Sequence, residues 1–392
     1  MPLLATLLLA ALALVAVPMV LYLFGMTLLS GQPRRPPHSG RSCRFDVIVP
    51  AHNETLVIER VLASLQLLDW PPDRLRVLVV ADNCSDDTAA KARQMGALVL
   101  ERQDPVNRGK GYALKHAFAR SAADGLADAV VVIDADSVVS PNLLEACAAR
   151  IALGEQAVQV HYGIQNPMAS WRTRLLTIAK GSFHIVRSRA RERLRLSCGI
   201  RGNGWCLTHA LLRAVPYECF SLTEDVEFGG VLGLAGHRVA YADEAHADAE
   251  MTTNAQVAST QRARWESGRF ELMRLQLPTL LRAAAGGSRL CFDLALDLLV
   301  LPLTYVALAA ALLLLGAVGG HALGLVGPAW VWLGVATAAL LALHVARGWW
   351  LSGVGLRGAL DLARVPVFIA WRLLVALKPK PRDWVRTDRE GR

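Results

Sequence analysis

The chain has 392 residues, of which 53% are hydrophobic, and a formal net charge of +9 at pH 7. This length allows one sizeable folded domain together with membrane segments, rather than several independent soluble domains. A positive charge can indicate nucleic-acid binding, but in so apolar a chain it is explained more simply by basic flanks that face anionic lipid. We therefore expect a membrane protein with no nucleic-acid partner.

The apolar residues gather in two regions, 3–30 and 289–346, whereas residues 41–285 have the mixed composition of a globular domain. This contrast predicts five parts in chain order. They are an N-terminal transmembrane helix with the start of a linker (1–32), a cytoplasmic globular domain (41–255), an interface helix (256–286), a transmembrane helical hairpin (289–347) and an amphipathic interfacial helix with a basic tail (348–392).

The first apolar segment, Leu3 to Leu29, carries no charge and is long enough to cross a hydrocarbon core of about 30 Å. A cleaved signal peptide is the alternative, but the segment lacks a basic start and its apolar run is too long, which favours an uncleaved anchor. Basic residues follow directly and place the middle domain in the cytoplasm by the positive-inside rule. They are Arg34, Arg35, Arg41 and Arg44.

The second apolar region predicts two crossings, 291–317 and 329–346, joined by a glycine-rich link. Residues 354–377 are apolar but contain charges that are costly in mid-bilayer, so we favour an interfacial helix over a further span. The interrupting residues are Arg357, Asp361, Arg364 and Arg372. The chain is thus expected to be a multi-pass protein of an inner or plasma membrane.

The middle domain reads as strands that alternate with helices. The expected strands are 45–50, 75–80, 98–100 and 129–133, and a helix is expected over 54–67. Such alternation predicts an α/β fold with a mostly parallel sheet covered on both faces. Ligands of these sheets bind outside the carboxyl ends of the strands, where the polar residues of interest fall here.

Asp134 and Asp136 follow the expected strand 129–133. Two positions apart in extended backbone, their carboxylates project to the same side. Carboxylates suit Mg²⁺ or Mn²⁺, which would bind through one or two of them and the phosphate oxygens of a substrate. A solvated loop is the alternative, and the position directly after a buried strand favours the metal site.

Thr223-Glu224-Asp225 places two adjacent carboxylates some ninety residues further on. They could simply open a helix, where acidic residues are favourable. Alternatively, Asp225 could act as a general base that accepts a proton from an attacking hydroxyl.

Gln261-Arg262-Ala263-Arg264-Trp265 lies in the expected interface helix. Gln261, Arg264 and Trp265 share one helical face, where the arginine could fork onto a diphosphate and the indole could support a sugar ring. Basic and aromatic residues beside a membrane are also common as interfacial anchors. The occurrence of all three motifs in this order favours a common site.

With these motifs in place, residues 45–270 resemble the membrane-bound branch of the family-2 glycosyltransferases, which includes cellulose, hyaluronan and chitin-oligosaccharide synthases and ceramide glucosyltransferase. The matching motifs are Pro50-Ala51-His52-Asn53-Glu54, Asp82-Asn83, Asn107-Arg108-Gly109-Lys110-Gly111, Asp134-Ala135-Asp136, Thr223-Glu224-Asp225 and Gln261-Arg262-Ala263-Arg264-Trp265. The resemblance implies a GT-A-type, Rossmann-like α/β domain beside the transmembrane helices.

The resemblance also implies a role for each matching residue. Donor-binding residues would be Pro50, Ala51, Asn53, Glu54, Asp82 and Lys110. Asp134 would face the sugar or nucleotide and share the metal with Asp136. Asp225, with Glu224 beside it, would be the catalytic base. Gln261 and Arg264 would hold the pyrophosphate, and Trp265 would support the acceptor.

The implied reaction is inverting transfer of a hexose or N-acetylhexosamine from a UDP-sugar to a lipid, lipid-linked or glycan acceptor, with Mg²⁺ or Mn²⁺ as cofactor. Two alternatives stay open: a processive polysaccharide synthase and an inactive membrane scaffold or binding subunit. The segment 202–209 departs from the pattern of many relatives near the acceptor loop. The sequence therefore leaves open the sugar, the acceptor and any partner subunit.

Overall fold

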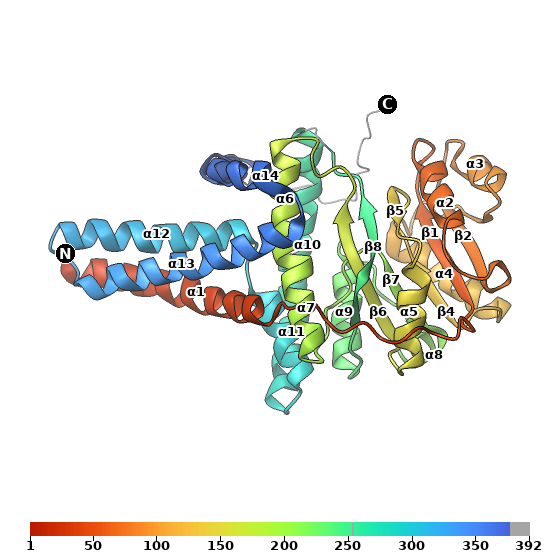
Figure 1. Ribbon diagram of the computed structural model, residues 1–392, viewed down its shortest axis with the longest axis horizontal. Coiled ribbons are helices and arrows are strands. Elements are labelled where there is room, and N and C mark those ends of the chain that lie inside the picture. Colours follow the sequence, from red (N-terminus) through yellow and green to blue (C-terminus); the bar gives the residue numbers. More distant parts are fainter. Residues whose placement is uncertain (253–254, 377–392) are drawn as a thin grey trace. The chain divides into compact units, whose positions relative to one another are not determined.

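The computed structural model describes residues 1–252 and 255–376, with the side chains of 255–266 and 371–376 outside that description. The chain divides into two compact units (Figure 1). The helical unit comprises residues 1–31, 168–191 and, among the described residues, 296–376. The sheet unit comprises residues 32–167 and the described part of 192–295.

The sheet unit contains an eight-stranded sheet with the order β3-β2-β1-β4-β7-β6-β8-β5. β1 pairs in parallel with β2 and β4, β2 with β3, and β6 with β8, whereas the other three pairings are antiparallel. This arrangement confirms the predicted mostly parallel α/β fold. The strands are β1 Phe45–Ala51, β2 Leu75–Asp82, β3 Leu98–Arg102, β4 Ala129–Val132, β5 Ser137–Val139, β6 Ala157–Ile164, β7 Trp205–Thr208 and β8 Ala240–Ala249.

Helices cover both faces of this sheet because its central strands are apolar on both sides. Along β1, Val47 and Val49 pack into one core with helices α2 and α5, while Ile48 packs into the opposite core with α4 and α9. The helices of this unit are α2 Ile58–Gln66, η1 Pro72–Arg74, α3 Thr88–Gln94, α4 Lys110–Asp124, α5 Leu143–Ala152, α8 His209–Ala214, α9 Glu224–Leu234, α10 Ala255–Ala285 and the first part of α11 Arg289–Leu299. The expected helix 54–67 begins only at Ile58, since residues 54–57 form a turn.

The order in which successive strands are added reverses at β1. β2 and β3 lie on one side of β1, and β4 lies on the other, so the edge between β1 and β4 is a topological switch point. β7 runs antiparallel to β4, with Val132 paired to Trp205. The residues that precede β7 therefore lie at the same edge as the residues that follow β4.

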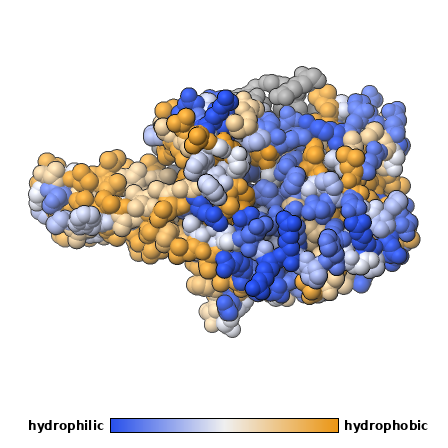
Figure 2. Space-filling model, in the orientation of Figure 1, coloured by the Kyte–Doolittle hydropathy of each residue, from blue (hydrophilic) through white to orange (hydrophobic). Residues whose placement is uncertain are grey.

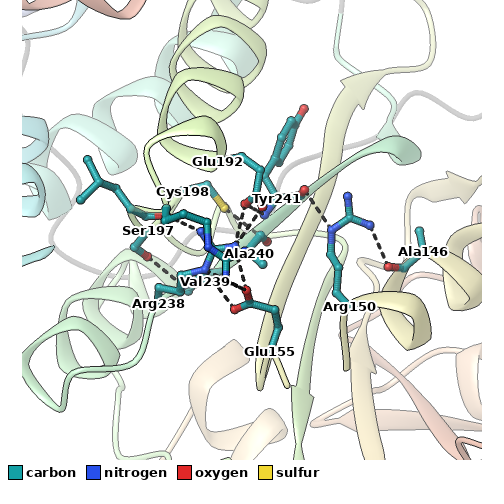
Figure 3. Close-up of polar contacts among 12 residues, drawn as sticks. Ala146, Arg150, Glu155, Glu192, Ser197, Cys198, Arg238, Val239, Ala240 and Tyr241 are labelled. Atoms are coloured by element: carbon teal, nitrogen blue, oxygen red, sulfur yellow. Dashed lines mark hydrogen bonds and ion pairs between the residues drawn. The ribbon is translucent and has the colours of Figure 1, made fainter. Parts of the chain in front are cut away.

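Partly buried ion pairs stabilise the region around the start of β8 (Figure 3). The Arg238 guanidinium donates to Glu155 at 3.0 Å and to Glu192 at 2.9 Å, and Glu192 also accepts from the Tyr241 amide at 2.8 Å. Arg150 donates to the Tyr241 carbonyl at 3.1 Å. These contacts fix the start of β8, just before a register shift in its pairing with β6.

Among its described residues, the helical unit contains three helices that are long and apolar enough to cross a membrane: α1 Pro2–Leu29, α12 Leu303–Ala322 and α13 Pro328–Ser352. They pack side by side (Figure 1). Their outward surfaces are largely apolar on the face shown in Figure 2, as lipid contact requires. The other helices of this unit are α6 Trp171–Lys180, the π-helix η2 Gly181–Val186, α7 Arg187–Arg193, α14 Gly355–Asp361, η3 Leu362–Arg364 and α15 Val365–Ala376.

The predicted first crossing of the hairpin, 291–317, is wrong at its start. Residues 289–299 form the separate helix α11, and the membrane-length helix begins at Leu303 after Pro302. Proline lacks an amide donor and begins a helix rather than continuing one. Asp297 in α11 also forms ion pairs with Arg187 and, at 2.8 Å, with Arg191, so this carboxylate is held by protein cations.

The predicted interfacial helix 354–377 is broken into α14, η3 and α15 in its described part. Asp361, at the end of α14, accepts from Arg174 at 2.5 Å and from Arg364 at 2.7 Å. The arginines neutralise a carboxylate that would be costly in an apolar surrounding. The placement of this segment at a membrane surface remains a prediction.

Candidate functional site

A tight turn follows β4 and carries Asp134-Ala135-Asp136. We call this segment the DxD turn, because any residue can stand between its two aspartates. β4 ends at Val132, and the Ser137 amide donates to the Asp134 carbonyl at 3.1 Å. The expectation that both aspartates lie in extended backbone is therefore wrong, because this hydrogen bond closes a turn of four residues. Both side chains stay partly exposed at the switch point.

The buried side chain of Asn203 holds this turn, and it was not predicted from the sequence. Its Oδ1 accepts from the Asp134 amide at 3.0 Å, and its Nδ2 donates to Ser137 Oγ at 2.8 Å. Asn203 reaches the turn because it immediately precedes the antiparallel strand β7. The only signal in the sequence is the pair of glycines on either side of it.

Lys110, the first residue of α4, joins several parts of the site. Its Nζ donates to Asp134 Oδ1 at 2.5 Å and to the Gly202 carbonyl at 2.5 Å, and it lies 3.9 Å from Glu224 Oε1. Burial alone would lower the pKa of Lys110, but Asp134 and Glu224 outweigh it and raise that pKa above the usual value. The lysine is therefore a fixed cation among carboxylates.

Close backbone approach brings α4 and the segment before α9 together. A Cβ added at Gly111 would lie only 2.3 Å from the Cys219 carbonyl oxygen, so no side chain fits there. Gly111 thus allows the start of α4, with Lys110, to lie beside the chain that leads into Glu224 and Asp225.

Glu224 and Asp225 occupy the first turn of α9. Burial raises the pKa of Glu224 to about 7, with Lys110 opposing and Asp225 adding to the shift. Burial likewise raises the pKa of Asp225, again against Lys110. The two readings of this motif are therefore compatible: the acids open a helix, and their pKa values move toward the range in which a general base works near neutral pH.

Asp225 lies beside the loop that contains Asn203. Gly202, whose φ is +90°, would place an added Cβ 3.1 Å from Asp225 Oδ2. One short segment thus contacts the DxD turn, Lys110 and Asp225, residues that are widely separated along the chain.

The carboxyl ends of β1 and β2 hold the other residues expected at the donor. The Glu54 amide donates to Thr88 Oγ1 at 2.8 Å, and Asn53 Oδ1 accepts from the Ser85 amide at 2.8 Å. Asp82 closes β2, while Pro50 and Ala51 close β1. All of them lie at the same edge of the sheet as the DxD turn, because β1 pairs in parallel with both β2 and β4.

A series of contacts through one arginine and two aromatic rings connects the end of β2 with the start of α4 and the segment before α9. These contacts were not predicted from the sequence. Arg102 donates to Asp82 at 2.6 Å, and its guanidinium carbon lies 5.8 Å from the centre of the Tyr112 ring. Tyr112 stacks on Phe220 with 4.2 Å between ring centroids. Asp82 is thus connected to the start of α4 and to the segment before α9.

Gln261, Arg264 and Trp265 have side chains outside the described residues. The backbone places them in α10, upstream of Gly268. An added Cβ at Gly268 would lie 2.6 Å from Thr223 Cγ2, and Gln276 Nε2 donates to the Glu227 carbonyl at 2.8 Å. α10 therefore packs along α9, and the motif begins six residues after the start of α10.

The residues present fit a divalent metal held jointly with a substrate. Among the described residues, no group of three or more His, Cys, Asp or Glu side chains could cage an ion. Mg²⁺ usually takes one or two carboxylates and completes its shell with substrate phosphates and water. Asp134 and Asp136 offer such a partial set, on a turn whose geometry is fixed by Asn203 and Ser137.

The strand order, the acidic turn at the switch point and the paired acids of α9 define a GT-A-like α/β domain, in a chain that also has apolar helices of membrane length. A family model described as glycosyltransferase-like family 2 matches residues 43–268, more than half of the chain, and the chain belongs to this family. The fold is similar to that of the mannosyltransferase PcManGT from Pyrobaculum calidifontis, solved in complex with GDP-Man and Mn²⁺ (TM-score 0.52, 20% identity, 88% of this chain and 99% of that one).

Curated relatives match the same region. The chain is 24% identical over 234 residues to the probable glycosyltransferase YdaM of Bacillus subtilis and 28% identical over 235 residues to a beta-monoglucosyldiacylglycerol synthase of Synechocystis. These alignments cover 57% of this chain and 55% and 47% of the two relatives. It is also 26% identical over 286 residues to cellulose synthase 1 of Komagataeibacter xylinus, covering 66% of this chain and 17% of that one. The chain thus spans about half or less of the length of these relatives.

Proposed function

We propose that this protein is an inverting membrane glycosyltransferase that transfers a hexose or N-acetylhexosamine from a UDP-sugar to a lipid, lipid-linked or glycan acceptor. The observation that carries the proposal is the position of Lys110, in contact with Asp134 and 3.9 Å from Glu224. Lys110, a partly buried cation, thus joins the motif that the family resemblance assigns to the donor site with the motif that it assigns to the catalytic base.

In the proposed reaction, the acceptor hydroxyl oxygen attacks the anomeric carbon of the donor while the bond from that carbon to the diphosphate oxygen breaks. Asp225 accepts the hydroxyl proton, and the nucleoside diphosphate leaves with the bonding electrons. Lys110 contributes positive charge near the leaving group, and Gln261 and Arg264 are assigned to the pyrophosphate. A single displacement inverts the anomeric centre and needs no covalent intermediate with the protein.

We assign Asp136, together with Asp134, to a bound Mg²⁺ or Mn²⁺. Such an ion stabilises negative charge on the departing diphosphate when it is bound. The remaining donor contacts are assigned to the ends of β1 and β2, with Pro50, Ala51, Asn53, Glu54 and Asp82 around the nucleoside. This assignment agrees with their place at the topological switch point.

The charge distribution supports a cytoplasmic catalytic domain beside an inner or plasma membrane. The described residues of the helical unit carry ten Lys or Arg and two Asp, and α1 and α12 carry no Lys, Arg, Asp or Glu at all. Positive residues flank membrane spans on the cytoplasmic side. A lipid acceptor would be accessible there, and the Synechocystis relative is named for synthesis of a glycolipid.

The proposal is tested by donor turnover of the purified full-length protein in detergent. UDP-glucose, UDP-galactose, UDP-N-acetylglucosamine and GDP-mannose are compared with Mn²⁺, with Mg²⁺ and with EDTA. We expect nucleotide release from a UDP-sugar that stops in EDTA and is lost in Asp136→Ala. Asp73→Ala removes a carboxylate whose side chain is 77% exposed, in η1 just before β2, and serves as the control. Full activity in EDTA would contradict the metal assignment.

Product length separates two forms of the proposal. Transfer to a lipid or a short acceptor gives a single radiolabelled product of low mass, and we favour it because the structure has three membrane-length helices among its described residues, few for a polymer channel. The relation to a cellulose synthase keeps the processive form as the alternative. A ladder of long products would establish that alternative instead.

A further inference from the structure

We propose that Asn203 and Ser137 act together as positioning residues for the metal-binding carboxylate of Asp136, an inference that rests on the proposed function. Neither residue belongs to the family motifs found in the sequence. Both are fully buried: Ser137 is the last residue of the turn that carries Asp134 and Asp136, and Asn203 contacts that turn.

The direction of each hydrogen bond in this group follows from donor and acceptor chemistry. The Asp134 amide can only donate, so the side-chain oxygen of Asn203 must face it, at 3.0 Å. The side-chain NH₂ of Asn203 then faces Ser137 Oγ, at 2.8 Å. Because Ser137 accepts this bond, its one hydroxyl proton remains for Asp136 Oδ1, at 3.3 Å. The result is a directed relay from Asn203 through Ser137 to Asp136.

This relay fixes the orientation of one carboxylate oxygen of Asp136. A donor on one oxygen of a carboxylate restricts the rotamer of the group and so helps to orient it toward an ion. Such outer partners of metal ligands commonly change metal affinity by about 10- to 100-fold when they are removed. Asp134 is also held at two points: Asn203 accepts a hydrogen bond from its amide, and Lys110 donates one to its carboxylate.

The backbone of Asn203 is itself immobilised from the sheet side. Gln159 on β6 donates to the Asn203 carbonyl at 2.6 Å and to the Gly204 carbonyl at 3.1 Å, while its side-chain oxygen accepts from the Arg201 amide at 2.8 Å. Asn203 lies in the loop before β7, but hydrogen bonds from Gln159 on β6 hold this loop in place. A buried support anchored to regular structure is what a precise ligand geometry requires.

The test measures metal binding directly, on the full-length protein in detergent. Mn²⁺ is titrated in the presence of UDP, and free Mn²⁺ is followed by its paramagnetic resonance signal. We expect Ser137→Ala to raise the Kd for Mn²⁺ about 10-fold. Ser137→Thr keeps the hydroxyl and is expected to restore most of the affinity. Ser140→Ala is the matched control, since Ser140 is a buried serine nearby whose hydroxyl accepts from the His246 amide.

A double-mutant cycle tests whether the two residues act as one relay. If they do, Asn203→Ala and Ser137→Ala combined weaken Mn²⁺ binding no more than Asn203→Ala alone. Thermal unfolding of each variant shows whether the fold is kept. Equal Mn²⁺ affinity in Ser137→Ala, Ser140→Ala and the unmodified protein overturns the inference, and so does an equal loss in both serine variants. Failure of the unmodified protein to bind Mn²⁺ with UDP overturns the proposed function itself.

Discussion

The ammonium group of Lys110 lies 2.5 Å from the carboxylate of Asp134, although the two residues come from different elements of the sheet unit. Lys110 opens α4, and Asp134 follows β4 at the switch point. This pair places a permanent positive charge among acids whose own charges would repel one another. Several properties of the protein are expected to depend on it.

Replacement of Lys110 by methionine is expected to lower kcat/KM by about 100-fold or more, the usual effect of removing one group that stabilises transition-state charge. The pKa values of Glu224 and Asp225 should rise further, because Lys110 opposes their upward shift. Lys115→Met is the control, as Lys115 is half exposed and pairs with Glu218. Steady-state nucleotide release over a pH range measures both effects; a variant that behaves like Lys115→Met would remove Lys110 from the site.

Replacement of Asp225 by asparagine is expected to lower kcat by about 10²- to 10⁴-fold, the range of a lost general base. In the unmodified protein, kcat/KM should fall as the pH drops below about 7, where the Glu224 and Asp225 pair takes up a proton. Glu224→Gln removes a neighbouring negative charge, so the fall should move to lower pH. Glu227→Gln in the same helical turn is the control. Unchanged nucleotide release in Asp225→Asn at saturating substrates would show that the base is another group.

Replacement of Glu224 by glutamine is expected to stabilise the fold above neutral pH. The pKa of Glu224 is raised from 4.5 to about 7 in the folded state, so the unfolded chain loses this proton first as the pH rises. The free energy of unfolding therefore decreases between about pH 4.5 and 7, and the penalty is complete above pH 7. Each 1 kcal/mol recovered should raise Tm by about 2–4 °C for a domain of this size.

Thermal scanning of the Glu224→Gln variant at pH 4.5 and pH 8 checks this sign. The gain in Tm should be complete at pH 8 and small at pH 4.5, where the glutamate is protonated in the folded state and about half protonated in the unfolded chain. A gain of equal size at both pH values would mean that packing, not burial of charge, is responsible.

Cysteine labelling is expected to place the link between α12 and α13 on one side of the membrane and the sheet unit on the other. Leu323, in the link between α12 and α13, is 75% exposed, and Val106, in the sheet unit, is 85% exposed. With Cys43 and Cys84 replaced by serine, a membrane-impermeant maleimide should label Leu323→Cys in intact cells. Val106→Cys should react only after permeabilisation. The reverse pattern would invert the proposed orientation.

The sequence predicted the architecture well wherever the pattern was local. Alternating buried residues on the central strands and the uncharged segment from Leu3 to Leu29 each carry their own signal, and the confirmed α/β fold and membrane-length helices follow from them. The start of the hairpin was misplaced, because the apolar composition of α11 hides the break at Pro302. The extended geometry expected for Asp134 and Asp136 failed because one backbone hydrogen bond closes a turn there.

By itself, the sequence determined which residue types could perform the chemistry and that they follow strands or open helices, since propensity and hydrophobic period act over a few neighbouring residues. Only the tertiary structure decided which of them meet. Asn203 reaches the Asp134 amide across 69 positions, and Lys110 reaches the Gly202 carbonyl across 92, because β7 returns antiparallel beside β4. Strand pairing of this kind is a property of the whole sheet, and no local pattern specifies it.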